Sequence, residues 1–88
     1  MNWYKIQVQD GTQHGHTFAG SSPDSLDQLI QKAMRREYLR LDNLVYWDQG
    51  QVKDWAEWDR RDAPTVCINP AHVLSIQPFK GDPRTLPR

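Results

Sequence analysis

The longest periodic pattern of apolar residues runs from Ser22 to Leu41 and predicts an amphipathic α-helix. Its apolar residues recur at steps of three and four, which places them on one stripe of a helix. These residues are Leu26, Leu29, Ile30, Ala33, Met34, Tyr38 and Leu41. Ser22 is a suitable N-cap, and Pro23 is a suitable first helical residue. We therefore expect a helix of roughly 25 Å that packs its apolar stripe on the other elements.

Two segments before this helix predict a β-hairpin. From Trp3 to Gln9, apolar and polar residues alternate, so Tyr4, Ile6 and Val8 share one face. An Asp-Gly turn signal follows this segment. The partner strand is expected from about His14 to Ala19.

Four segments after the helix are expected to complete a sheet. Leu44–Trp47 is apolar on both faces, which predicts a central strand. Val52–Asp59 fits a strand or a helix, and we favour a strand because the segment is short and follows a hairpin-like turn. Thr65–Ile68 and Val73–Gln77 flank an Asn-Pro turn and predict two antiparallel partners.

Together these elements predict a small α+β fold. Short connections favour antiparallel neighbours, so we expect a curled antiparallel sheet or open barrel of about five to six short strands. One amphipathic helix packs on it. A chain of 88 residues forms one domain. We place this domain at residues 1–79 and expect a flexible C-terminal tail at 80–88, because proline and glycine interrupt that end.

The composition narrows the classes of function. Eleven basic and eleven acidic residues give a formal net charge of zero, whereas proteins that mainly bind nucleic acid are usually basic. No apolar run approaches the roughly 18 residues of a membrane span, and the N-terminus has no signal-peptide core. The single cysteine cannot form an internal disulfide. We therefore expect a cytoplasmic protein that does not associate with membranes.

The first candidate site is the acidic and aromatic stretch from Asp48 to Asp62. Five acidic and three basic residues give this stretch a charge of −2. Aromatic residues on a surface of mixed charge are typical of an interaction hot spot. The stretch therefore predicts a surface for a protein partner or a second copy of the chain, with the alternative that its indoles belong to the core. The predicted partner-binding residues are Trp47, Trp55, Trp58, Asp54 and Glu57.

The second candidate site is the basic end of the predicted helix. Spacing at i, i+4 and i+8, with one further arginine beside it, places four cations on one solvent-facing stripe. These are Lys32, Arg35, Arg36 and Arg40, and Lys80, Arg84 and Arg88 add positive charge near the C-terminus. Phosphate contact on this stripe gives the alternative function, nucleic-acid binding. A solvated helix face is the ordinary alternative.

Histidine and cysteine give two further candidates. His14 and His16 lie at i, i+2 on one strand face and would begin a metal site with Cys67 or His72. None of the usual zinc spacings is present, so we expect exposed histidines and no metal. Cys67 lies between valine and isoleucine, which predicts a small buried residue rather than a nucleophile activated by His72.

The sequence contains none of the common short motifs of enzymes and cofactor-binding proteins. There is no glycine-rich phosphate loop, no nucleophile elbow and no His-Glu-x-x-His metal motif. We therefore expect a non-enzymatic interaction module without a cofactor.

Overall fold

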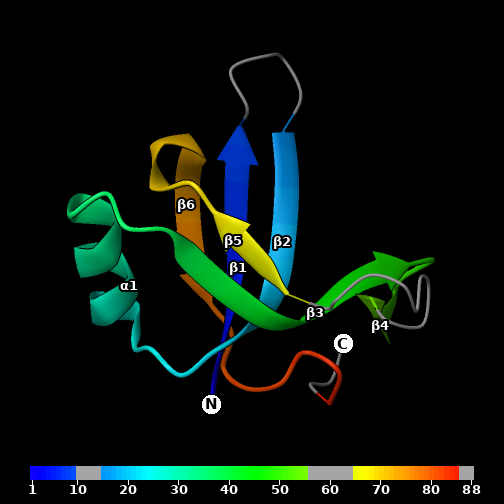
Figure 1. The fold of residues 1–88 in the computed structure, drawn as a ribbon. Helices are drawn as coiled ribbons and strands as arrows, with labels where there is room; N and C mark the ends of the chain where they lie inside the picture. Colours follow the sequence, from blue (N-terminus) through cyan, green and yellow to red (C-terminus); the bar gives the residue numbers. More distant parts are fainter. Residues whose placement is uncertain (10–14, 56–64, 86–88) are drawn as a thin grey trace.

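The computed structural model describes residues 1–9, 15–55 and 65–85. In this part of the chain, six strands and one α-helix form an open antiparallel sheet with one packed helix, the α+β fold that the sequence predicts (Figure 1). The elements are β1 (Asn2–Gln9), β2 (Gly15–Ser22), α1 (Leu26–Met34), β3 (Leu39–Asp48), β4 (Gln51–Asp54), β5 (Val66–Ile68), the 3-10 helix η1 (Pro70–His72) and β6 (Val73–Pro78).

The sheet curls because its longest strand, β3, changes partner along its length. The strand order is β4-β3-β2-β1-β6, and β5 pairs with β3 off this path. The first residues of β3 pair with β5, its middle pairs with β2 and its last four residues pair with β4. As a result, β3 crosses in front of the β1–β2 hairpin and carries β5 over it (Figure 1).

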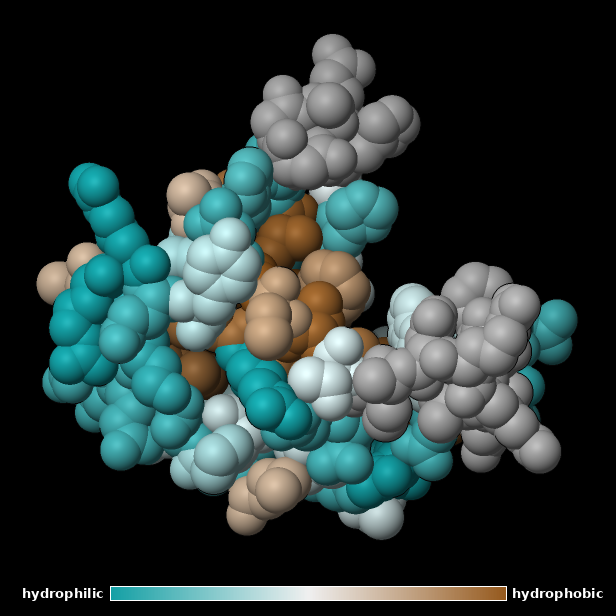
Figure 2. Space-filling view, in the orientation of Figure 1, coloured by the Kyte–Doolittle hydropathy of each residue, from teal (hydrophilic) through white to brown (hydrophobic). Residues whose placement is uncertain are grey.

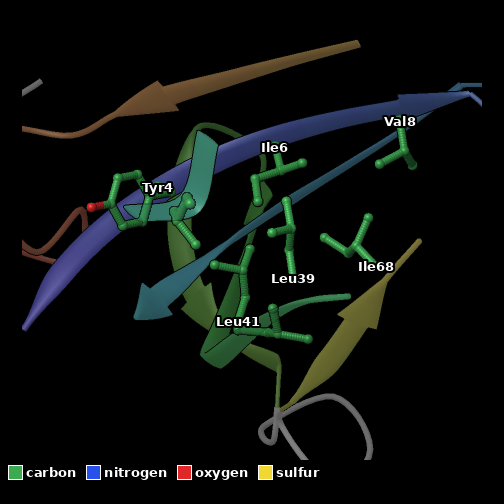
Figure 3. Packing of buried hydrophobic residues seen from close by; sticks show 8 residues of the cluster. Tyr4, Ile6, Val8, Leu39, Leu41 and Ile68 are labelled. Atoms are coloured by element: carbon green, nitrogen blue, oxygen red, sulfur yellow. The ribbon is translucent and has the colours of Figure 1, made fainter. Parts of the chain in front are cut away.

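Two hydrophobic clusters lie on opposite faces of the sheet, because neighbouring residues of β1 belong to different clusters. The inner face carries the larger cluster, in which β1 side chains point toward β3 and β5 (Figure 3). Its buried members are Tyr4, Ile6, Val8, Leu29, Leu39, Leu41, Leu44 and Ile68. The outer face carries a smaller cluster of Trp3, Ala19 and Val45, with Val52 and Phe79 packed against it. The alternation predicted for the first strand is therefore confirmed, except that its second face is also partly covered.

The helix begins later and ends earlier than predicted. Ser25, not Ser22, is the N-cap: its hydroxyl accepts from the Gln28 N–H at 3.2 Å, and the Gln28 side chain accepts from the Ser25 N–H at 2.7 Å. This is a capping box. α1 ends at Met34, and Arg36 has a left-handed φ of 61° that breaks the helix. Ser22 is instead a buried residue of β2.

The predicted apolar stripe was wrong over much of its length. In α1 only Leu29 is buried, while Ile30 and Met34 are exposed. Leu41 was counted on the stripe, but it belongs to β3 together with Leu39. These two leucines are two positions apart, which is the period of a strand face. The three-residue step from Tyr38 to Leu41 therefore resembled a helical period, although Tyr38 lies after the helix and Leu41 lies in β3.

Several strand predictions also need correction. β2 extends to Ser22 rather than ending at Ala19, and β3 begins at Leu39 rather than Leu44. The last two strands do not pair with each other as expected: β5 pairs with β3, and β6 pairs with β1. The 3-10 helix at the Asn-Pro turn separates them. The predicted segment Val52–Asp59 is strand only in β4, and its residues from 56 onward lie outside the described ranges.

The segment after β6 lies on the outer face of the sheet. The Phe79 N–H donates to the Trp3 carbonyl at 2.9 Å. The Arg84 guanidinium lies 4.9 Å from the centroid of the Trp3 ring. Pro83, which precedes Arg84, is buried. We call residues 79–85 the C-terminal segment. It forms most of the stretch that the sequence predicted as a tail, and it passes below β3 and β4 in Figure 1.

Candidate functional site

An open pocket of about 470 Å³ lies on the outer face beside the C-terminal segment. Strand alternation explains its position, because Lys5 lies between the inner-facing residues Tyr4 and Ile6. Lys5 is opposite Ala19 in β2, and Ala19 is opposite Val45 in β3, so one row crosses three strands. We call this hollow the outer-face pocket. Its lining residues are Lys5, Thr17, Val45, Tyr46, Trp47 and Phe79.

Trp47 is the most prominent aromatic side chain of this region. It is 47% exposed. Its ring stacks on Phe79 of the C-terminal segment, with centroids 6.1 Å apart and planes 25° from parallel. A second pocket of about 400 Å³ is lined by Tyr46, Trp47, Asp48 and Trp55. Because both pockets include Trp47 and Tyr46, we call them together the Trp47 surface.

Trp55 supports this surface from the side of the core. It is half-buried, packs against the larger cluster and meets Tyr46 edge to face, with ring centroids 5.8 Å apart. Core and partner-binding roles were predicted as alternatives, whereas Trp55 both packs against the core and lines the second pocket. Two other predicted partner-binding residues, Glu57 and Trp58, lie outside the described ranges.

Two acidic residues beside the Trp47 surface, Asp48 and Asp54, form ion pairs. Lys53 pairs with Asp48 at 3.1 Å, beside the second pocket. Arg84 pairs with Asp54 of β4 at 3.0 Å and with Asp82 at 2.7 Å. The hydrogen bonds from Arg84 hold the pKa of Asp82 below its usual value, and the same contacts raise the pKa of Arg84. Asp54, predicted as a partner contact, is therefore also an internal ion-pair partner.

The basic stripe predicted from helix spacing does not exist. Arg40 lies on β3, and Arg36 lies beyond the end of α1, because the helix stops at Met34. Three of the four cations are paired within the chain. Lys32 contacts Asp24 at 2.6 Å, Arg35 contacts Glu37 at 3.1 Å, and Arg40 contacts Asp42 at 3.0 Å. These contacts neutralise most of the charge that would have met phosphate.

Cys67 was expected to be buried but is exposed. β5 has three residues, and its last residue, Ile68, faces the core. Because successive side chains of a strand point to opposite faces, the preceding residue, Cys67, points outward. Cys67 and His72 line a common pocket of about 200 Å³ with apolar walls. Apolar side chains are open to the surface over β1 and β5 in Figure 2.

The histidines do not form a metal site in the described part of the chain. His14 lies outside it and His16 is exposed. The His72 ring Nδ1 lies 2.9 Å from the Gln9 carbonyl oxygen. Because a carbonyl can only accept, this nitrogen carries the proton. No group of three or more histidine, cysteine or acidic residues in the described ranges is placed to hold a metal ion.

The outer-face pocket contains residues that the sequence reasoning did not select. Lys5 and Thr17 lie in segments that were predicted as strands, but they were given no role, and no role was predicted for Phe79. The available signal was the alternation of β1, which already grouped Trp3 with Lys5 on one face. The contact between β1 and a residue more than 70 positions later depends on tertiary packing.

Among the residues that the structure describes, no helix has the length and apolar character needed to cross a membrane. Comparisons with protein-family models, curated proteins and solved structures found no match.

Proposed function

We propose that this protein is a small non-enzymatic interaction module that docks on a protein partner, or on a second copy of itself, through the Trp47 surface. The observation that carries the proposal is the half-exposed Trp47 ring between two pockets. Tryptophan is enriched among residues that dominate binding energy at interfaces. Burial of the exposed part of this indole would contribute about 2 kcal/mol by apolar area alone.

The surroundings of Trp47 support a docking role. Phe79 stacks on its ring, so part of the side-chain freedom of Trp47 is already lost before binding. The pairs Lys53–Asp48 and Arg84–Asp54 form a charged rim, which suits orientation of a partner. The exposed free thiol of Cys67 suits a reducing compartment such as the cytoplasm.

The first test is the association state of wild type, Trp47→Ala and the control Tyr38→Ala. Tyr38 is 62% exposed and lies on the connection between α1 and β3, so it matches Trp47 in character but not in location. Light scattering after size exclusion measures mass against the monomer value of 10.3 kDa. We expect wild type and Tyr38→Ala to associate and Trp47→Ala to be monomeric, with unchanged circular dichroism.

If wild type is monomeric, the same three proteins are used as bait, and the captured protein is purified and its affinity measured. We expect Trp47→Ala to lose at least tenfold in affinity, which corresponds to about 1.4 kcal/mol. Equal association or equal affinity in Trp47→Ala and wild type would contradict the proposal.

The alternative of nucleic-acid binding is read in the same experiment from the ratio of absorbance at 260 and 280 nm. Binding through phosphate weakens steeply with salt. The internal pairing of Lys32, Arg35 and Arg40 favours the protein-docking proposal over this alternative. A raised ratio that falls after a high-salt wash would reverse that preference.

A further inference from the structure

Lys5 is a cation of the outer-face pocket that has no carboxylate partner. Arg84 of the C-terminal segment and Lys53 of β4 each hold an acidic partner, but Lys5 makes no ion pair in the described part of the chain. Its cross-strand neighbours are Ala19 and Gln77, which carry no charge. The positive charge of Lys5 is therefore open to an external anion.

Among the described residues, no acidic side chain lines the outer-face pocket and competes for Lys5. Two acidic side chains of β4 and the C-terminal segment, Asp54 and Asp82, are both held by Arg84. Among the described residues that line the pocket, an incoming carboxylate would therefore meet one unpaired cation and no carboxylate. The hydroxyl of Thr17, which also lines the pocket, is available as a hydrogen-bond donor.

The opposite part of the pocket is apolar. The Trp47 and Phe79 rings are stacked within 25° of parallel, and Val45 of the outer cluster lies beside them. Such a surface suits a large aromatic or aliphatic side chain, which gains by leaving water and by ring contacts. One cation beside an apolar wall therefore selects a ligand that carries both an apolar body and a nearby negative charge.

We infer that the outer-face pocket binds an acidic peptide segment of the partner, with a large apolar side chain against Trp47 and Phe79 and an adjacent carboxylate on Lys5. This inference rests on the proposed function and specifies the chemistry of the partner. A peptide fits better than a nucleic acid, because one unpaired cation matches one carboxylate, whereas a phosphate backbone requires several cations.

The test uses two short probes of opposite charge, N-acetyl-Asp-Phe-amide and N-acetyl-Lys-Phe-amide, titrated into ¹⁵N-labelled protein. Amide and indole resonances report the location of binding residue by residue. We expect the acidic probe to shift the amides of Lys5 and Thr17 and the indole N–H of Trp47 in a saturable manner. The lysine probe should bind about tenfold more weakly, as expected for loss of one charge-assisted contact.

One variant and one matched control test the charge of Lys5. Lys5→Gln should weaken the acidic probe by about fivefold to tenfold and remove its preference over the basic probe. The matched control is Arg36→Gln, because Arg36 also lacks an ion pair in the described residues and lines a different pocket with Met34 and Pro70. It should leave both titrations unchanged. Both positions are exposed, so thermal unfolding should confirm that the fold is retained.

The outcomes distinguish this inference from the proposed function. If Trp47→Ala abolishes association but the two probes bind equally, or Lys5→Gln has no effect, the acidic ligand is wrong and the docking surface stands. If an acidic probe shifts none of the three reporters, the inference is also overturned. If an eight-residue oligothymidylate shifts the same resonances at lower concentration than the acidic probe, the pocket selects nucleic acid instead.

Discussion

At the scale of single residues, close contacts across β2 and β3 decide which side chains are tolerated. Gly20 lies against β3 with no room for a side chain: a Cβ placed there would be 2.7 Å from the Asp42 carbonyl oxygen and 3.0 Å from Leu44 Cδ2. The register of the two strands shifts between Ala19 and Ser21. Gly20 therefore permits an approach that a larger residue would prevent.

We expect Gly20→Ala to destabilise the protein by about 1–3 kcal/mol, since a backbone oxygen must move to admit the methyl group. Gly15→Ala is the matched control, because its Cβ would be 3.5 Å from the nearest atom, the Val8 carbonyl oxygen. Urea unfolding curves measure both free energies. Equal stability of the two variants would show that β3 yields easily at this point.

Another single residue connects the core to the start of the helix. The Tyr4 hydroxyl donates to the Asp24 carbonyl at 2.6 Å, and the Asn2 amide donates to the same oxygen at 3.0 Å. Burial, together with the nearby Asp24 carboxylate, raises the pKa of Tyr4 above its ordinary value of 10.0. These bonds fix the turn before the N-cap Ser25, and α1 begins at Leu26.

At the scale of elements, local sequence signals identified the segments better than their ends. The alternation in β1 and the Asn-Pro turn at η1 were read correctly, because each depends on neighbouring residues. The helix start was misplaced since Ser22 and Ser25 both precede residues suited to a first turn, and only Ser25 has glutamine three positions later. The capping-box pattern of Ser25 and Gln28 is therefore visible in the sequence and would have predicted the correct N-cap.

Strand partners could not be derived in the same way. The turn between β5 and β6 suggested a hairpin, but pairing depends on where the rest of the sheet is placed. For the candidate site, Trp47 was predicted from composition. Lys5 and Phe79 could not be joined to it, since β1, β3 and the C-terminal segment meet only in the folded chain.

Removal of the helix cap tests the corrected boundary. We expect Ser25→Ala to cost about 1 kcal/mol of unfolding free energy, because the Gln28 N–H loses its acceptor. Gln31→Ala, at an exposed position within the helix, should change stability by less than about 0.5 kcal/mol. Thermal unfolding followed by circular dichroism measures both variants. A larger effect in Gln31→Ala would argue against Ser25 as the cap.

At the scale of the whole molecule, Arg84 connects three distant parts of the chain. It contacts Trp3 in β1, Asp54 in β4 and Asp82 within its own segment. These contacts hold the C-terminal segment on the outer face, where Phe79 forms one wall of the outer-face pocket. The shape of the proposed docking surface therefore depends on residues near both ends of the described chain.

The Arg84 network should make stability depend on acidity. The pKa of Asp82 is lowered in the folded protein, so its contribution is present above the ordinary value of 3.8 and is lost as the pH falls through the folded value. We expect Arg84→Met to lose about 0.5–1 kcal/mol at pH 7 and less than this below pH 3, because these charges are partly exposed.

The control is Arg35→Met, which removes an exposed pair with Glu37 and, among the described residues, no cation–π contact with a tryptophan. Urea unfolding at pH 7, 5 and 3 gives the comparison. A constant difference between Arg84→Met and wild type at all three values would mean that packing on Trp3, rather than charge, accounts for the effect of Arg84.

The shared pairing of β3 has a further consequence for motion. Its early residues hold β5 and the inner cluster, and its late residues hold β4 and Trp47. An opening that frees one end of this strand weakens the support of the other, so amide hydrogen exchange at both ends should follow a common unfolding event. A ligand on Trp47 would then slow exchange at Leu39 and Leu41, far from the place where it binds.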